Sequence, residues 1–261
     1  MISRSLELQL PKYTTSGHTL ISIPYTPIFL INVGIALGSF STCVTLGYVL
    51  HFEGATATEC KVPNVVPSIS AITGGFTPER YVWRYGMAYF SWPRTFDSFL
   101  IYGFFAASSL NRKAWYSILN KISWLCYVIE HVSLFALTYV SSTENYAIHE
   151  KGFIFFVACS IGHMVLSTYL FKHAHPEPRN YNERMSWRLR LCSMIVFFLS
   201  LLLSAYFFVR HTLYCEPYMY SFYGFSEYVL ILSNVSFHCS QYYDLAGCRL
   251  MITSPLITKH F

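Results

Sequence analysis

Charged side chains are scarce in this sequence. Asp, Glu, Lys and Arg make up 12% of its 261 residues, against about 25% in soluble domains, while hydrophobic residues make up 54%. So few charges do not cover a soluble surface, and we expect one integral membrane domain over residues 1–261. The net charge of +5 does not indicate nucleic-acid binding, because the Lys and Arg residues lie in short segments between apolar runs.

Three kinds of motif are also missing. No CxxC pair and no His/Cys spacing typical of a metal site occurs, so we expect neither a metal nor another cofactor. No internal repeat or low-complexity linker divides the chain. Residues 1–19 are too polar for the core of a signal peptide and the first apolar run is too long for one, so we expect the first span to remain as a signal anchor.

Six apolar stretches approach the roughly 20 residues that a helix needs to cross a 30 Å hydrocarbon core. They predict an all-α, polytopic membrane bundle of about six transmembrane helices, with spans at about 28–50, 84–106, 118–140, 151–171, 191–209 and 219–241. The second stretch is the least regular, because Arg84, Arg94 and Asp97 interrupt it.

The Lys and Arg residues indicate the orientation of these spans. Twelve flank one side, whereas five flank the other: Lys61, Arg80, Arg84, Lys151 and Arg210. Because basic residues resist translocation, the richer side should be cytosolic. Both termini would then be cytosolic, and segments 51–83, 141–150 and 210–218 would face the lumen or the outside.

Of the eight cysteines, Cys60 and Cys215 alone fall in the extracytoplasmic segments. An oxidising compartment permits a disulfide between them, which would tie the loop after the first span to the loop between the fifth and sixth. Two free thiols are the alternative.

Ionisable residues inside the spans need partners, because a charge at the bilayer centre costs about 2.5–3.5 kcal/mol on insertion scales. Arg94, Glu130 and Glu227 lie at a similar predicted depth on three helices, so one Arg could bridge two carboxylates. Such a network could be purely structural or could form the polar floor of a cavity. Asp97, on the same helical face as Arg94, could instead neutralise it locally. We expect structural roles for the intramembrane histidines His131, His163 and His238.

A second polar group collects where the spans meet the extracytoplasmic surface. It comprises His51, Glu53, Arg80, Arg84, Glu144, His149, Glu150, Arg210, His211 and Glu216. Histidine beside carboxylate suits proton abstraction from a hydroxyl, and arginine suits a phosphate. This rim favours an anionic lipid headgroup, although a solvated collar of loop charges has the same residue types. The segment 63–78 could be a lid over the bundle or an interfacial loop.

Several stretches together resemble one known family. They are HFEGATATECKVPNVVPSIS (51–70), PERYVWR (78–84), LTYVSSTENYAIHE (137–150), IGHM (161–164), RHTLYCE (210–216) and the segment 227–244. In order and over almost the whole chain, they are similar to the post-GPI attachment to proteins factor 2 family. That family is part of a wider group of six-span membrane proteins that includes the damage-regulated autophagy modulators.

The resemblance implies a multi-pass protein of Golgi and endoplasmic reticulum membranes that acts in GPI-anchor lipid remodelling. The implied step is reacylation of a lyso-GPI at the sn-2 position with a saturated fatty acid, which stable surface display of GPI-anchored proteins requires. The partners would be lyso-GPI and an acyl donor, and other GPI-remodelling proteins are further candidates.

The residues and the resemblance together predict a reaction at the rim. By expected role, the catalytic candidates are His149, His211 and Glu150, the phosphate-binding candidates are Arg80, Arg84 and Arg210, and the supporting residues are His51, Glu53 and Glu216. One histidine would deprotonate the sn-2 hydroxyl, which then attacks the acyl donor. Adjacent helical residues diverge, so a pair across segments, such as His211 with Glu150, is favoured.

Two other functions stay open. The His-x4-Asp motif of soluble-faced glycerolipid acyltransferases is absent, and the nearest spacing, His238 to Asp244, is one residue too long and cytosolic. A non-enzymatic bundle that binds the GPI lipid or assists a separate enzyme is therefore the rival hypothesis. A proton-linked transporter using Glu130, Glu227 and His163 is weaker, because no inverted repeat or broken helix is visible.

Overall fold

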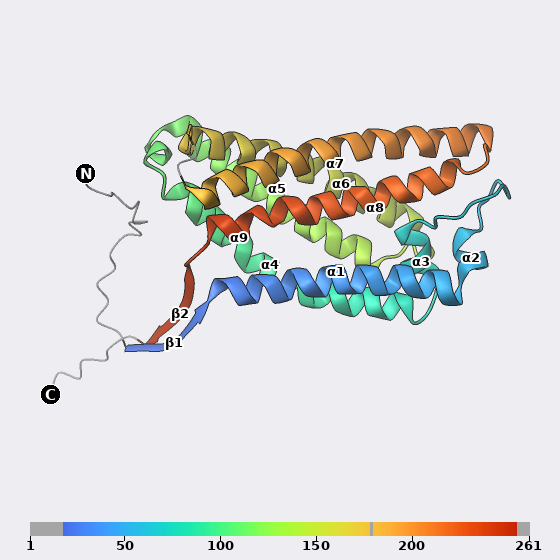
Figure 1. The fold of residues 1–261 in the computed structure, drawn as a ribbon, viewed down its shortest axis with the longest axis horizontal. Coiled ribbons are helices and arrows are strands. Elements are labelled where there is room, and N and C mark those ends of the chain that lie inside the picture. The colour runs from blue at the N-terminus through green and yellow to red at the C-terminus, as the bar shows by residue number, and fades with distance from the viewer. Residues whose placement is uncertain (1–17, 178–179, 255–261) are drawn as a thin grey trace.

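The computed structural model describes residues 18–177 and 180–254, which form a bundle of long helices (Figure 1). In chain order the elements are β1 His18–Pro24, α1 Tyr25–Leu50, α2 Phe52–Thr56, α3 Ile69–Gly75, α4 Glu79–Ala106, the 3-10 turn η1 Ser109–Arg112, α5 Ala114–Tyr139, α6 Tyr146–Ala174, α7 Tyr181–Tyr214, α8 Met219–His238, α9 Ser240–Asp244 and β2 Arg249–Ser254. The predicted all-α polytopic membrane fold is confirmed.

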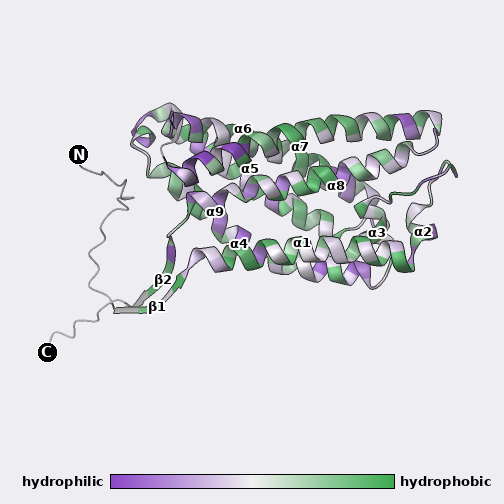
Figure 2. Cartoon of the chain, viewed as in Figure 1, coloured by the Kyte–Doolittle hydropathy of each residue, from purple (hydrophilic) through white to green (hydrophobic). Residues whose placement is uncertain are grey.

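The predicted spans coincide with the long helices α1, α4, α5, α6, α7 and α8, except that the sixth, at about 219–241, runs past the end of α8 at His238 into α9. Within the described residues, four of these are long and apolar enough to cross a membrane: α1, α5, α6 and α7. In Figure 2, α7 is hydrophobic along most of its length. Helices α4 and α8 carry the ionisable residues Arg94, Asp97 and Glu227, which lowers their apolar content. The count of six spans and the cytosolic termini stay predictions.

The helices extend beyond several predicted spans because polar residues cap them. Helix α6 begins at Tyr146 because the Asn145 side chain accepts a hydrogen bond from the Ile148 amide at 3.1 Å. Helix α7 begins at Tyr181 in the same way, after the cap Asn180. At its other end α7 stops at Cys215, which adopts a left-handed conformation with φ of 50°.

A two-stranded antiparallel sheet, which the sequence did not predict, joins the two ends of the described chain. Strand β1 pairs with β2, so that Ile23 lies opposite Leu250 and Ser22 opposite Met251. The Tyr25 amide continues the contact by donating to the Cys248 carbonyl at 3.0 Å. The sheet therefore places residues 18–24 and 249–254 at the same end of the bundle (Figure 1).

The opposite end of the bundle carries α2, α3 and the loops 140–145 and 215–218, and we call it the α3 end (Figure 1). Helix α1 packs on α4, α5 on α6, and α7 on α8. A small residue permits the approach of α1 to α4, because a Cβ on Gly86 of α4 would lie 1.8 Å from Ser39 Oγ of α1. These pairs surround the polar groups of the candidate site.

Candidate functional site

A cavity lies inside the bundle between α1, α3, α4, α5, α6 and α8. The volume inside it that is open to the centre of a water-sized sphere is about 90 Å³. Its lining is mainly apolar, and the polar side chains in it are Ser70, Thr73, Arg94, Thr138, His149, Glu227 and Asn234. Leu37 on α1 and Leu232 on α8 line the cavity and are also 37% and 41% exposed. The cavity therefore reaches the lipid-facing surface between these two helices.

His149 lies in the first turn of α6 and lines the cavity. Its Nδ1 is 2.9 Å from the Val140 carbonyl oxygen, and its Nε2 is 3.1 Å from Ser70 Oγ. Because a carbonyl oxygen can only accept a hydrogen bond, Nδ1 of the neutral ring carries the proton and donates. Nε2 is then the basic nitrogen, and it accepts a hydrogen bond from the Ser70 hydroxyl.

Ser70 is held in place because the chain before it is bonded along α8. The contacts are the Val65 amide to Ser221 Oγ at 2.8 Å, the Ile69 amide to Glu227 Oε2 at 3.0 Å, and the Tyr228 hydroxyl to the Pro67 carbonyl at 2.7 Å. Gly224 allows this contact, since a Cβ there would lie 2.8 Å from the Val66 carbonyl oxygen. The segment considered above as a lid thus forms part of the cavity wall through α3.

A second attachment joins α3 to the neighbouring loop. The Gly74 carbonyl accepts hydrogen bonds from the Arg80 guanidinium and from the Thr143 hydroxyl, the latter at 2.8 Å. Arg80, a predicted phosphate ligand, is therefore bonded to the backbone of α3. Helix α3 is fixed on both sides, between α8 and the loop that also supplies Val140.

The other two predicted phosphate ligands have carboxylate partners. Arg84 donates to Glu144 at 2.6 Å and to the Tyr139 carbonyl at 3.0 Å. The hydrogen bond from Arg84, reinforced by the Ser141 backbone amide, lowers the pKa of Glu144 from 4.5 to about 2. Arg210 pairs with Glu216 through two hydrogen bonds, one of them Nε to Oε2 at 2.9 Å.

The expected pairing of His211 with Glu150 is not formed. His211 is buried, on a helix that supplies none of the cavity's lining residues, and its ring centroid is 4.8 Å from that of Tyr220. Glu150 and Glu53 are exposed. Adjacent positions on a helix diverge, which is why His149 faces the cavity while Glu150 does not.

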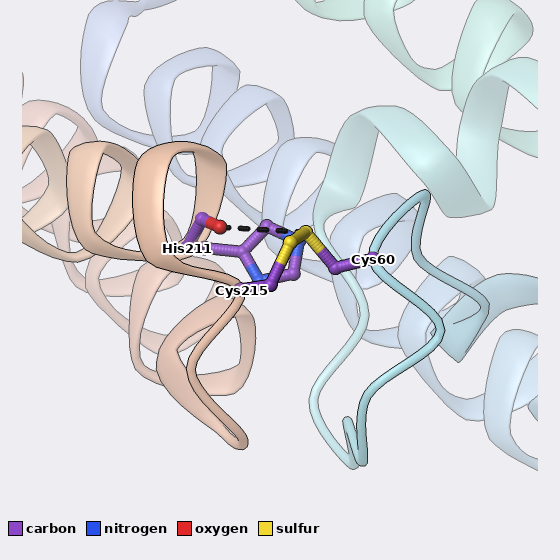
Figure 3. Close-up of a disulfide and its surroundings, with 3 residues drawn as sticks. All are labelled: Cys60, His211 and Cys215. Atoms are coloured by element: carbon purple, nitrogen blue, oxygen red, sulfur yellow. Dashed lines mark hydrogen bonds between the residues drawn. A yellow bond between two sulfur atoms is a disulfide. The ribbon is translucent and has the colours of Figure 1, made fainter.

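The predicted disulfide between Cys60 and Cys215 is present, with Cα atoms 5.4 Å apart (Figure 3). It links the loop after α2 to the end of α7, and the His211 ring lies beside it in the figure. A Cys60 Sγ to His211 carbonyl distance of 3.4 Å is a packing contact, because a disulfide sulfur has no hydrogen to donate. The disulfide thus ties the end of α7 to the loop that precedes α3.

Where the spans meet the surface, a histidine–carboxylate pair that crosses segments is formed by His51 and Glu79, and Glu79 was not among the residues predicted from the sequence. His51 Nδ1 is 2.7 Å from Glu79 Oε1, and the His51 ring stacks on Phe76 at 4.7 Å between centroids. The Glu79 side chain is fully buried at the start of α4. Its position could have identified it as a structured residue, because acidic residues favour the first turn of a helix.

The buried network around Arg94 contains His238 and Asn234 in place of the predicted Glu227. Arg94 Nη2 lies 2.8 Å from Glu130 Oε1 and 2.6 Å from His238 Nε2, and the Asn234 amide donates to the same carboxylate at 3.1 Å. Glu227 is bonded to the Ile69 amide instead. Asp97 does not form the local pair with Arg94, because it accepts from the Tyr25 hydroxyl at 2.9 Å. The reason is the rotation of the helices about their axes, which brings His238 to Glu130.

A further buried pair, which the sequence did not predict, lies near the other end of the bundle. Arg190 is 1% exposed, pairs with Asp244, and donates to Ser167 at 3.2 Å. Its guanidinium also lies 5.1 Å from the Phe171 ring centroid.

Among the described residues, no three His, Cys, Asp or Glu side chains gather as a metal site.

Comparison with known proteins places the chain in a family. Residues 24–248 match the family described as Frag1/DRAM/Sfk1/Cwh43P N-terminal domain. The chain is 34% identical to post-GPI attachment to proteins factor 2 from Caenorhabditis elegans over 93% of both chains. It is also 34% identical to acyltransferase PGAP2 from Xenopus tropicalis, over 92% of this chain and 94% of that one.

A third relative is acyltransferase PGAP2 from Danio rerio, 36% identical over 76% of this chain and 84% of that one. No solved structure matches the chain. The protein therefore belongs to the Frag1/DRAM/Sfk1/Cwh43P family, and within it to the group of post-GPI attachment to proteins factor 2.

Proposed function

We propose that this protein is an acyltransferase of GPI-anchor lipid remodelling, which attaches a saturated acyl chain to the sn-2 hydroxyl of a lyso-GPI in Golgi and endoplasmic reticulum membranes. Family membership supports the role in GPI-anchor remodelling, and the names of the frog and zebrafish relatives include acyltransferase. One observation carries the proposal: a histidine with an accepting Nε2 lies on the wall of an apolar cavity that reaches the lipid-facing surface.

The cavity suits an acyl chain. Its α4 wall extends from Trp83 to Arg94, and these residues are about 16 Å apart along a helix at 1.5 Å per residue. Between them the lining is apolar, including Met87 and Phe90. An alkyl chain entering between α1 and α8 would leave the membrane without meeting water, so its transfer costs little free energy.

His149 is the base in this proposal. The sn-2 hydroxyl would give its proton to Nε2, while the Val140 carbonyl holds the ring through Nδ1 and stabilises the imidazolium that forms. His149 is preferred over His211 because it lines the cavity.

Arg84 is the arginine best placed for the lipid phosphate. It follows the lining residue Trp83 and donates to the carbonyl of Tyr139, which follows the lining residue Thr138. Its partner Glu144 has a 40% exposed side chain, so a phosphate could take the place of that carboxylate at the guanidinium. Arg210 lies on α7, away from the cavity lining.

Purified protein in liposomes with lyso-GPI and acyl lipids tests the proposal. We expect diacyl GPI to form without another protein, and His149→Ala to lower the rate by about a hundredfold or more. His211→Ala should retain product formation, which decides between the two histidines. No product from the wild-type protein, or equal loss in both variants at equal folded amount, would contradict the assignment.

The rival is a non-enzymatic protein that binds lyso-GPI and presents it to a separate enzyme. It is favoured by the buried Arg94–Glu130 pair, whose two charges compensate each other inside the bundle, as in a structural network. The same liposomes distinguish it, because the rival predicts binding of lyso-GPI without product until a second protein is added.

A further inference from the structure

We infer that Ser70 is a nucleophile that takes an acyl chain from an ester-linked membrane lipid and passes it to the lyso-GPI hydroxyl. This inference rests on the proposed function, because it uses the same cavity and the same base. It adds the covalent intermediate, the residue that carries it and the chemical class of the acyl donor.

The geometry is that of an activated serine. Ser70 Oγ lies 3.1 Å from His149 Nε2, within hydrogen-bond reach of a base that is itself oriented by the Val140 carbonyl at 2.9 Å. Nucleophile, base and orienting acceptor are the three parts that serine acyltransfer requires, and they occur on unrelated folds. Ser70 and His149 both line the cavity, so an acyl ester inside it can reach the hydroxyl.

Hydrogen bonds around Ser70 hold its hydroxyl beside His149. The preceding amide, of Ile69, is bonded to the carboxylate of Glu227, which also lines the cavity. The loop that carries Val140 is joined to α3 by the bond from Thr143 to the Gly74 carbonyl. Serine and histidine thus lie on two segments that are joined to each other next to the reacting atoms, and Glu227 acts as a positioning residue.

The charges around the cavity favour a lipid ester as donor over an acyl-coenzyme A thioester. Among the described residues that line the cavity, Arg94 is the only Lys or Arg, and Glu130 pairs with it at 2.8 Å. Arg80 and Arg210 are bonded within the protein, and Arg84 is assigned to the phosphate of the GPI lipid. A thioester donor with several phosphates would need more unpaired cations than this site has, whereas a glycerophospholipid enters from the membrane.

In the first half-reaction the Ser70 proton moves to His149 Nε2 while Oγ attacks the ester carbonyl of the donor phospholipid. The tetrahedral adduct collapses, the acyl C–O bond to glycerol breaks, and the departing alkoxide takes the proton from His149. The products are acyl-Ser70 and a lysophospholipid.

In the second half-reaction the sn-2 hydroxyl of lyso-GPI gives its proton to His149 and attacks the acyl-Ser70 carbonyl. Collapse releases the Ser70 oxygen, which regains the proton from His149. The products are diacyl GPI and the free serine, so no oxidant, metal or water is consumed.

The decisive experiment measures the first half-reaction alone. Full-length protein in liposomes that contain phosphatidylcholine with an alkyne-tagged saturated chain is incubated without lyso-GPI. We expect the tag to attach to the protein, to map to Ser70 by mass spectrometry, and to leave when lyso-GPI is added. A lipophilic fluorophosphonate should label the same serine, and His149→Ala should reduce that labelling by about a hundredfold.

Variants separate the chemistry from folding. Ser70→Ala should lose tagging and product, whereas Ser70→Cys should be tagged through a thioester that neutral hydroxylamine cleaves. Ser142→Ala, a loop serine at the same end of the bundle that does not line the cavity, is the matched control and should behave as wild type.

Three other outcomes would each contradict a different part of the proposed reaction. Undiminished product from folded Ser70→Ala would overturn the covalent intermediate and leave the proposed function standing. Tagging from a tagged acyl-coenzyme A but not from the phospholipid would overturn the donor class. Tagging of wild-type Ser70 without any diacyl GPI would support the serine and contradict the proposed acceptor.

Discussion

At the scale of single residues, the buried charges of this bundle have partners on other helices. Arg94 and Glu130 have side chains that are 3% and 0% exposed, and His238 and Asn234 add further hydrogen bonds to them. A charge left without its partner in such a place is costly, whereas removal of both charges is much less so. The contribution of Arg94 is therefore testable by comparing single and double variants.

Arg94→Met should lower the free energy of unfolding by about 3–5 kcal/mol, because Glu130 then stays buried without its cation. The double variant Arg94→Met, Glu130→Leu should recover part of this loss. Thermal unfolding in detergent measures both, with the exposed Arg188→Met as control. A double variant that loses the full sum of the two single losses would contradict this coupling.

The Arg84–Glu144 pair gives a pH dependence with a defined sign. The folded pKa of Glu144, about 2, lies below its ordinary value of 4.5. The contribution of the pair to stability is therefore fully present above pH 4.5 and is lost as the pH falls through about 2. The difference in melting temperature between wild type and Glu144→Gln should be constant near neutral pH and shrink below pH 4.5. A difference that grows on acidification would have the wrong sign.

At the scale of elements, the contact between α1 and α4 depends on a residue without a side chain. Because a Cβ on Gly86 would lie 1.8 Å from Ser39 Oγ, the two helices cannot keep their spacing around a larger residue. The same contact holds α4 beside the cavity, so its disturbance should reach the site.

Gly86→Ala should destabilise the protein by about 1–3 kcal/mol, the usual cost of overpacking. Gly103→Ala on the same helix is the control, because a Cβ there would meet nothing within 4 Å. Thermal unfolding of both variants in detergent measures the difference. Equal melting temperatures for the two would mean that the helices separate freely at this contact.

At the scale of the whole molecule, the Cys60–Cys215 disulfide spans 155 residues and joins the first extended loop to the last helical hairpin. It lies at the α3 end, the side predicted to face the lumen or the outside. The position of the disulfide agrees with that orientation, because disulfides persist in oxidising compartments.

Peptide mapping of unreduced, denatured protein should recover Cys60 and Cys215 as one linked pair. The six other cysteines, Cys43, Cys126, Cys159, Cys192, Cys239 and Cys248, should all be alkylated. Both members of the pair should react after reduction. Recovery of Cys60 and Cys215 as alkylated thiols before reduction would remove the disulfide and its support for the orientation.

The sequence by itself determined the membrane fold and the cysteine pair. Long apolar runs specify membrane helices locally, because a helix satisfies its own backbone hydrogen bonds and needs only length and composition to enter lipid. Cys60 and Cys215 could be paired because the charge bias of the loops put only these two on one side. The sequence also identified the residues of the polar rim, but it did not show which of them are in contact.

Only the tertiary structure decided which of these side chains are in contact. The rotation of each helix about its axis decides which side chains come together. It turns His149 toward the cavity and Ser70, and it brings Glu79 to His51. It also brings His238, rather than Glu227, to Arg94. Likewise, β1 and β2 pair only once the bundle has brought both ends of the described chain together. Residues far apart in sequence come within hydrogen-bond distance through packing, and a single sequence carries no local signal for that.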